Sequence, residues 1–81
     1  MTSFNLYPNP SDGYFQLEAE FGEWESLDVE VFSIVGQLVF VQRVTGTEVR
    51  LDLDIRDVAK GTYILRMRGE SGSLLRKVVI R

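Results

Sequence analysis

Apolar and polar residues alternate along most of the chain with a period of two. In the segment 14–21 every odd-numbered position is apolar, and mostly polar residues lie between them. The same alternation recurs in 27–31, 49–53 and 63–67. A period of two is typical of strands that bury one face. The pattern therefore predicts four half-buried strands.

Two further segments alternate less regularly. Residues 38–44 begin with apolar side chains on both faces, and Arg76 interrupts the apolar series in 74–81. Each segment predicts a strand that contains a bulge or is covered on both sides. With a short seventh segment at 5–7, the chain predicts an all-β fold, a small antiparallel Ig-like β-sandwich of six to seven strands. Two sheets would then bury their apolar faces against each other.

Turn residues separate the predicted strands. They include glycines that can adopt the positive φ of tight turns, at Gly13, Gly22, Gly36 and Gly46. The segment 54–60 is a helical candidate, with Asp54 as its N-cap and Gly61 at its C′ position. These signals predict one short helical turn before the strand at 63–67.

Length and composition restrict the functions that the chain can have. Its 81 residues predict a single domain over 1–81 with one modest core, residues 1–4 being the remnant of a linker. Cysteine and histidine are both absent, which excludes disulfides, Ser-His and Cys-His catalysis and the ordinary zinc sites. The longest apolar run, Leu38–Val41, is far too short to cross a bilayer. We therefore expect no enzyme, no cofactor and no membrane span.

Charge is distributed unevenly along the chain. All nine basic residues lie from Arg43 onward, whereas seven of the twelve acidic residues precede it. The net charge of −3 argues against nucleic acid as a partner, because phosphates attract basic surfaces. The asymmetry predicts cross-strand pairing between acidic early strands and basic late ones.

Two prolines restrict the backbone of the segment Tyr7-Pro8-Asn9-Pro10-Ser11-Asp12-Gly13. Each proline restricts its own φ and the conformation of the residue before it, so the segment is a stiff approach to the first hairpin. As a structural element it would be an entry loop, with Tyr7 packed over the open end of the sandwich. A stiff loop is also a good recognition surface.

Two further motifs lie near the C-terminus. In Gly61-Thr62-Tyr63-Ile64-Leu65-Arg66, we expect Tyr63 to enter the core with its hydroxyl group reaching polar atoms. The terminal Lys77-Val78-Val79-Ile80-Arg81 predicts a strand that another protein could bind, either by adding a strand to its edge or through its charged side chains. Alternatively, its cationic side chains protect an edge strand from aggregation.

Together with the central Val31-Phe32-Ser33-Ile34-Val35-Gly36-Gln37, these motifs resemble the type A C-terminal sorting domain of the Bacteroidota type IX secretion system, the Por secretion tail. The resemblance extends from Asn5 to Arg81. It implies a non-catalytic signal that directs an upstream passenger through the periplasm and across the outer membrane to the cell surface or medium. It also implies three partners: an outer-membrane shuttle, a translocon, and a sortase-like cysteine peptidase that cuts upstream of the domain. The candidate recognition residues are Tyr7, Pro8, Asn9, Pro10, Gly13, Gly36, Gly61, Tyr63, Lys77, Val78, Val79, Ile80 and Arg81.

Other chemistries have weaker support in the sequence. Asp52, Asp54 and Asp57 could bind calcium, but they lack the glycine turn and distal glutamate of a calcium loop, so a cap and two solvated carboxylates are expected instead. Trp24 could stack on a sugar, which would make the sandwich a carbohydrate-binding module, although we expect it to close one end of the core. A structural Ig-like spacer is the remaining alternative.

Overall fold

The structure is a computed structural model that describes residues 2–81. Five strands form one antiparallel sheet: β1 (Ser3–Tyr7), β2 (Tyr14–Ser33), β3 (Leu38–Asp54), β4 (Gly61–Gly69) and β5 (Gly72–Ile80). The long strand β2 is central, since it pairs with β1, β3 and β4, and β5 pairs with β4. The molecule measures 35 × 22 × 16 Å along its principal axes.

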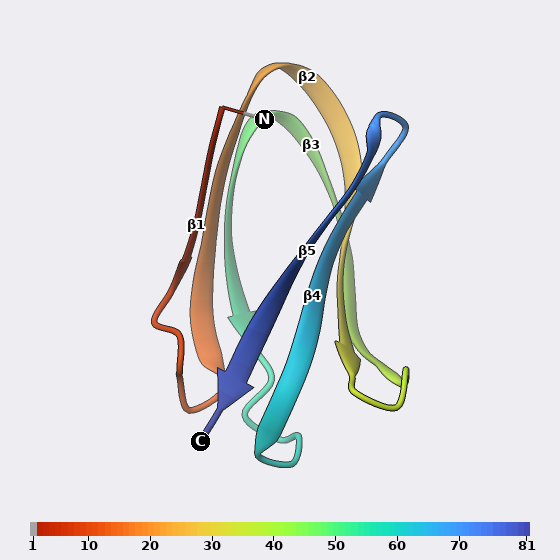
Figure 1. Ribbon diagram of the computed structural model, residues 1–81. Helices are drawn as coiled ribbons and strands as arrows, with labels where there is room; N and C mark the ends of the chain where they lie inside the picture. The colour runs from red at the N-terminus through yellow and green to blue at the C-terminus, as the bar shows by residue number, and fades with distance from the viewer. Residues whose placement is uncertain (1) are drawn as a thin grey trace.

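Strands β2 and β3 bend together at a shared corner. Their pairing is interrupted between Glu20 and Glu25 of β2, where the register shifts. Gly22 on β2 and Gly46 on β3 have positive φ values of 82° and 140°. Residues with a Cβ atom rarely adopt such values. Figure 1 shows both strands arching over at this point. The corner folds the sheet back on itself.

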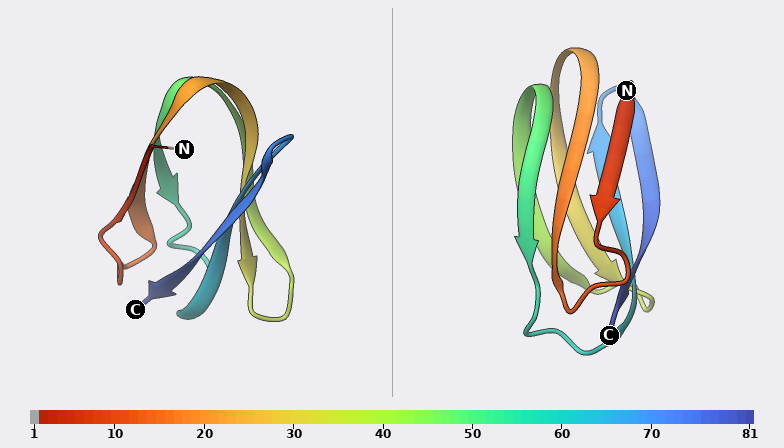
Figure 2. Two further views of the ribbon diagram at one scale, coloured as in Figure 1. Left: turned by 45° about the horizontal axis from the view of Figure 1, so that its top comes forward. Right: turned by 90° about the vertical axis from the view of Figure 1, so that its left-hand side faces the viewer.

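The bend produces two layers (Figure 2). One layer holds β1, the first half of β2 and the second half of β3; the other holds the first half of β3, the second half of β2, β4 and β5. This all-β antiparallel architecture agrees with the predicted small sandwich. The predicted strand count is wrong, because 14–21 and 27–31 are halves of β2 and 38–44 and 49–53 are halves of β3. Gly22 and Gly46 bend continuous strands instead of ending them.

The core lies between the two layers. Its buried side chains come from the apolar phase of the alternation in four of the strands and from the loop after β3: Phe15, Leu17, Ala19, Phe21, Leu27, Val29, Val31, Val49, Leu53, Ile55, Tyr63, Leu65, Met67, Val78 and Ile80. Phe4 and Leu6 of β1 and Leu74 of β5 pack against this set. They come from the side where β1 and β5 do not pair with each other, which we call the open side. The hydrophobic effect therefore specifies which face of each strand turns inward.

The predicted helical turn is absent from residues 54–60. Val58 N–H donates to the Ile55 carbonyl at 3.1 Å, which closes a single turn in the connection between β3 and β4. Asp54 does not cap a helix; its carboxylate accepts the Arg56 backbone N–H at 3.2 Å. This side-chain to backbone bond offers the chain an alternative to helix formation. Gly61 is likewise not a helix cap, because it begins β4.

The two irregular segments have different explanations. In 38–44, a register shift opposite Val31 and Phe32 confirms a bulge or irregularity, while Val41 is exposed, so the strand is not covered on both sides. In β5, the pairing with β4 is continuous and Leu75 is exposed, so neither expectation holds there. The Arg76 guanidinium instead lies over the Phe4 ring, 5.1 Å from its centre, and spans the open side between β5 and β1.

Candidate functional site

The proline-containing loop after β1 is bound to the last strand. The Asn9 side-chain amide donates to the Lys77 carbonyl at 2.9 Å, and the Val79 N–H donates to Asn9 Oδ1 at 3.0 Å. One carboxamide thus supplies the donor and the acceptor that a neighbouring strand would present to β5. Figure 1 shows the loop beside the end of β5. Two sequence motifs from opposite ends of the chain therefore form one structural unit.

Ser11 extends the same contact through its backbone. Its N–H donates to the Val79 carbonyl at 3.0 Å, and its carbonyl accepts the Arg81 N–H at 2.8 Å. These bonds form a short parallel bridge between Ser11 and Ile80. We call the contacts of Asn9 and Ser11 with β5 the clasp. Because the clasp occupies the outer edge of β5 from Lys77 to Arg81, a partner cannot add a strand there without displacing the loop.

Gly13 anchors the other end of this loop. Its carbonyl accepts the Ile55 N–H at 2.8 Å, and its φ is 109°. A Cβ atom at this position would lie 2.8 Å from the Arg56 Cα, too close for any real contact. Both the backbone angle and the close approach therefore require glycine here. The loop is held to β5 on one side and to the connection after β3 on the other.

Tyr7 has a different position from the one expected. It lies opposite Gln16 on the outer face of the first layer, where it is partly exposed, and its hydroxyl group donates to Glu18 Oε1. The prediction that it packs over the open end of the sandwich is wrong, because β1 is in a register that turns Leu6 inward instead. The hydrogen bond to Glu18 raises the pKa of the Tyr7 phenol above 10.0, since it stabilises the protonated form.

The last five residues divide between two faces. Val78 and Ile80 are 0% and 3% exposed and belong to the core. The alternation places Lys77 and Val79 on the opposite, outward side, and Arg81 follows directly after β5; we call these three residues the terminal face. Within residues 2–81, neither Lys77 nor Arg81 takes part in an ion pair. The segment therefore packs Val78 and Ile80 into the core and leaves the terminal face outside it.

The remaining candidate residues are Tyr63, which lies in the core, and two glycines with positive φ, Gly61 and Gly36. Tyr63 is buried and its hydroxyl group donates to the Ala59 carbonyl, which confirms that it enters the core with a polar partner. Gly61 has a φ of 150° at the start of β4, and no neighbouring atom of residues 2–81 lies within 4 Å of where its Cβ would be. Gly36 has a φ of 88° in the β2–β3 turn, where its N–H donates to the Ser33 carbonyl at 2.9 Å.

Ion pairs connect the acidic strand β2 with basic residues of β3 and β4. Asp28 pairs with Arg43 at 3.2 Å, and Glu30 pairs with Arg66 at 2.8 Å on the outer face of the second layer. Arg68 lies 3.5 Å from Asp28 and 3.6 Å from Glu30. Hydrogen bonding to the nearly buried Glu30 raises the pKa of Arg66. The predicted cross-strand pairing of early acids with late bases is confirmed.

The alternative chemistries do not gather into a site. Trp24 is 71% exposed at the corner of β2, so the prediction that it closes one end of the core is wrong. Tyr14 begins the same strand and lies at the opposite end of that layer, so the two rings form no shared sugar platform. Arg56 binds the Asp54 carboxylate at 2.7 Å and lowers its pKa by hydrogen bonding. Across residues 2–81, no three acidic side chains come together as metal ligands.

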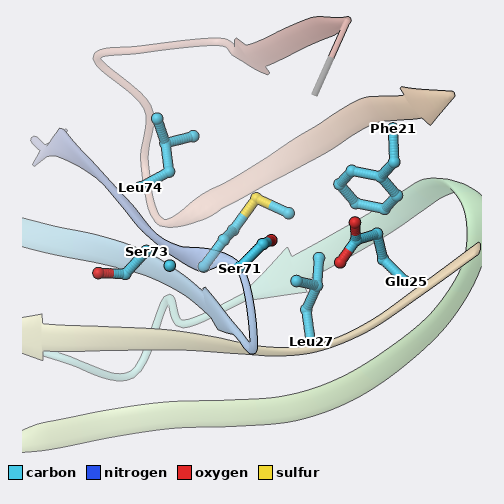
Figure 3. Close-up of a pocket in the computed structure, with 8 residues that line it drawn as sticks. Phe21, Glu25, Leu27, Ser71, Ser73 and Leu74 are labelled. Atoms are coloured by element: carbon cyan, nitrogen blue, oxygen red, sulfur yellow. The ribbon is translucent and has the colours of Figure 1, made fainter. Parts of the chain in front are cut away.

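A cavity of about 210 Å³ lies between the corner and the β4–β5 hairpin. Figure 3 shows Phe21 and Leu27 beside it, with the Glu25 carboxylate between them and Ser71, Ser73 and Leu74 around the rest. The corner of β2 and the β4–β5 turn, whose residues line the cavity, lie at the end of the molecule away from the C-terminus (Figure 1). None of the candidate recognition residues lines it. Within residues 2–81, no helix is long and apolar enough to span a membrane.

Comparisons with known proteins give one family match. A search of curated proteins finds no significant match. The family described as the secretion system C-terminal sorting domain matches residues 5–81, which includes both halves of the clasp and the terminal face. A match over nearly the whole chain defines membership. The chain therefore belongs to the C-terminal sorting domains of the type IX secretion system.

Proposed function

We propose that the chain is a non-catalytic tail that directs an upstream passenger through the type IX system, and that the machinery recognises it at the clasp and the terminal face. Membership of the family makes this domain a C-terminal secretion signal. The observation that supports the location is the pair of hydrogen bonds between Asn9 and β5. They bring the proline motif and the C-terminal motif, 68 to 70 residues apart, onto one end of the molecule.

The shuttle and translocon of the type IX system are the proposed partners. Because Asn9 and Ser11 already occupy the edge of β5, we propose that these partners bind the side chains of Lys77, Val79 and Arg81 instead of adding a strand. Lys77 and Arg81 form no ion pair within residues 2–81, and two such cations suit an acidic surface. The buried Val78 and Ile80 fix the orientation of this face.

The direction of β1 suits a passenger attached upstream. β1 starts beside the corner of β2, since Ser3 pairs with Glu20, and it runs toward the loop that carries the clasp. Figure 1 shows the C-terminus at the end of the molecule away from the start of β1. We propose that a passenger is thereby held away from the recognition face, in the periplasm during transit and at the cell surface or in the medium afterwards. The sortase-like peptidase would act on the chain at or before Phe4.

An export assay tests this function. The chain is fused after a soluble reporter with its own periplasmic export signal, in a bacterium that has the type IX machinery. We expect the reporter to reach the cell surface or medium, and loss of residues 78–81 to leave it in the periplasm. Lys77→Ala should reduce export by less than the truncation, with little change in melting temperature. If the parent fusion stays periplasmic while another sorting tail works in the same strain, the proposed function is wrong.

A further inference from the structure

The turn between β2 and β3 exposes two large aliphatic side chains. Ile34 and Val35 are 74% and 84% exposed, although the turn itself is well defined by hydrogen bonds. Ser33 N–H donates to the Gln37 carbonyl at 2.8 Å, and Gln37 N–H donates to Ser33 Oγ at 3.1 Å. Turns of this kind favour polar residues and glycine. We call Ile34 and Val35 the hairpin tip.

The tip continues into an apolar strip on the outer face of the second layer. Phe32 lies opposite Leu38 of β3 on one side and Ile64 of β4 on the other. Ile64 in turn lies opposite Lys77 of β5. Phe32 and Ile64 are half-buried and Leu38 is 46% exposed, so this row reaches the surface, with the Arg66 guanidinium lying over the Phe32 ring, 4.9 Å from its centre. The strip, defined as Leu38, Phe32 and Ile64, crosses the layer from β3 to the terminal face.

The terminal face and the tip therefore form one surface. Val79 lies opposite Thr62, which places it one outward row beyond the Ile64–Lys77 row, toward the end of the layer that also carries the tip. Figure 1 shows the β2–β3 turn and the C-terminus at the same end of the molecule. A continuous apolar surface rimmed by charge is typical of a protein-binding site. Trp24, which is similarly exposed, lies at the other end and is not part of it.

From this continuity we infer that the hairpin tip and the strip are a second contact for the same protein partner that binds the terminal face. The partner surface would hold an apolar pocket for Ile34 and Val35, with carboxylates near it to meet Lys77 and Arg81. This inference rests on the proposed function, because the terminal face gives the binding surface its position. It makes recognition depend on the folded domain, since the tip and the terminal face meet only after β2, β4 and β5 have paired.

The test uses the reporter fusion with the tip made polar. Ile34→Ser/Val35→Ser should lower the exported fraction roughly tenfold, the loss expected when central side chains leave an interface. Its melting temperature should stay close to that of the parent, because both side chains are exposed. Trp24→Ser removes an equally exposed apolar side chain from the opposite end and should export like the parent. Export of the tip variant at the parent level, while loss of residues 78–81 still stalls export, would overturn the inference and leave the proposed function standing.

Charge and other occupants are tested separately. With carboxylates around the pocket, Val35→Asp should lose more export than Val35→Lys, and equal losses would contradict the acidic surface.

The purified chain should sediment as a monomer and should not float with vesicles of phosphatidylethanolamine and phosphatidylglycerol. Self-association or vesicle binding that disappears in the tip variant would overturn the inference in favour of a second copy or a lipid surface. Failure of the parent fusion itself would instead contradict the proposed function.

Discussion

Asn9 and Val79 are seventy residues apart in the chain, and the Val79 backbone N–H donates to the Asn9 carboxamide at 3.0 Å. The same carboxamide donates to Lys77 at 2.9 Å, so a single side chain takes the place of a neighbouring strand. The proline motif therefore has a structural role that its own sequence does not reveal. It holds the strand that carries the C-terminal motif.

The first prediction concerns this side chain. Asn9→Ala should lower the free energy of unfolding by about 1 to 2 kcal/mol, because two hydrogen bonds to the backbone are lost. Hydrogen exchange at the Val79 amide should also become about tenfold faster, because this amide loses its acceptor. Asn5→Ala is the matched control, since Asn5 is exposed on β1 and makes no side-chain hydrogen bond within residues 2–81. Equal exchange at Val79 in both variants would contradict the clasp.

The second prediction compares two glycines with positive φ. Gly61→Ala adds a side chain where no atom lies within 4 Å, so only the backbone angle is unfavourable, at about 1 to 2 kcal/mol. Gly13→Ala meets the Arg56 backbone at 2.8 Å as well, and should cost about 1 to 3 kcal/mol more. Urea unfolding of both variants measures the difference. Similar midpoints would show that the loop does not approach Arg56 as closely as the structure indicates.

The third prediction concerns the ionisation of Tyr7. The bond to Glu18 raises the folded-state pKa, so its contribution to stability is fully present below pH 10 and is lost as the pH rises through the raised value. The Tyr7 ring carbon signals in an NMR titration should report a pKa above 10.0 in the parent. Glu18→Ala should bring the pKa back toward the ordinary value. An identical titration in both proteins would mean that the phenol and the carboxylate do not interact in solution.

Alternation of apolar and polar positions predicted the fold well, because burial of one strand face is a local signal. The inward phase of β2 and β4 is the one expected. The corner was not predictable in the same way. Gly22 and Gly46 permit a turn or a bend equally, and only the pairing of β2 with β3 on both sides of the corner decides between them.

The contact between the proline motif and the terminal motif was not predicted. The two motifs were identified separately, whereas the bond from Asn9 to β5 depends on how the layers close. A signal was present, since Asn is one of the few side chains that can mimic both backbone groups of a strand. The exposure of Trp24 and of Tyr7 depended on strand register and on the corner, neither of which local composition determines.

The central claim is that the clasp and the terminal face act as one recognition unit, beyond their contribution to stability. It is tested most directly by comparing exported reporter for Asn9→Ala and Val29→Ala. Val29 is fully buried in β2, and its truncation should cost stability of about 1 to 3 kcal/mol, comparable to the loss of the clasp, without touching β5. With melting temperatures measured for both, Asn9→Ala should export several-fold less than Val29→Ala. Equal export at equal stability would contradict the claim and reduce the proline motif to a structural loop.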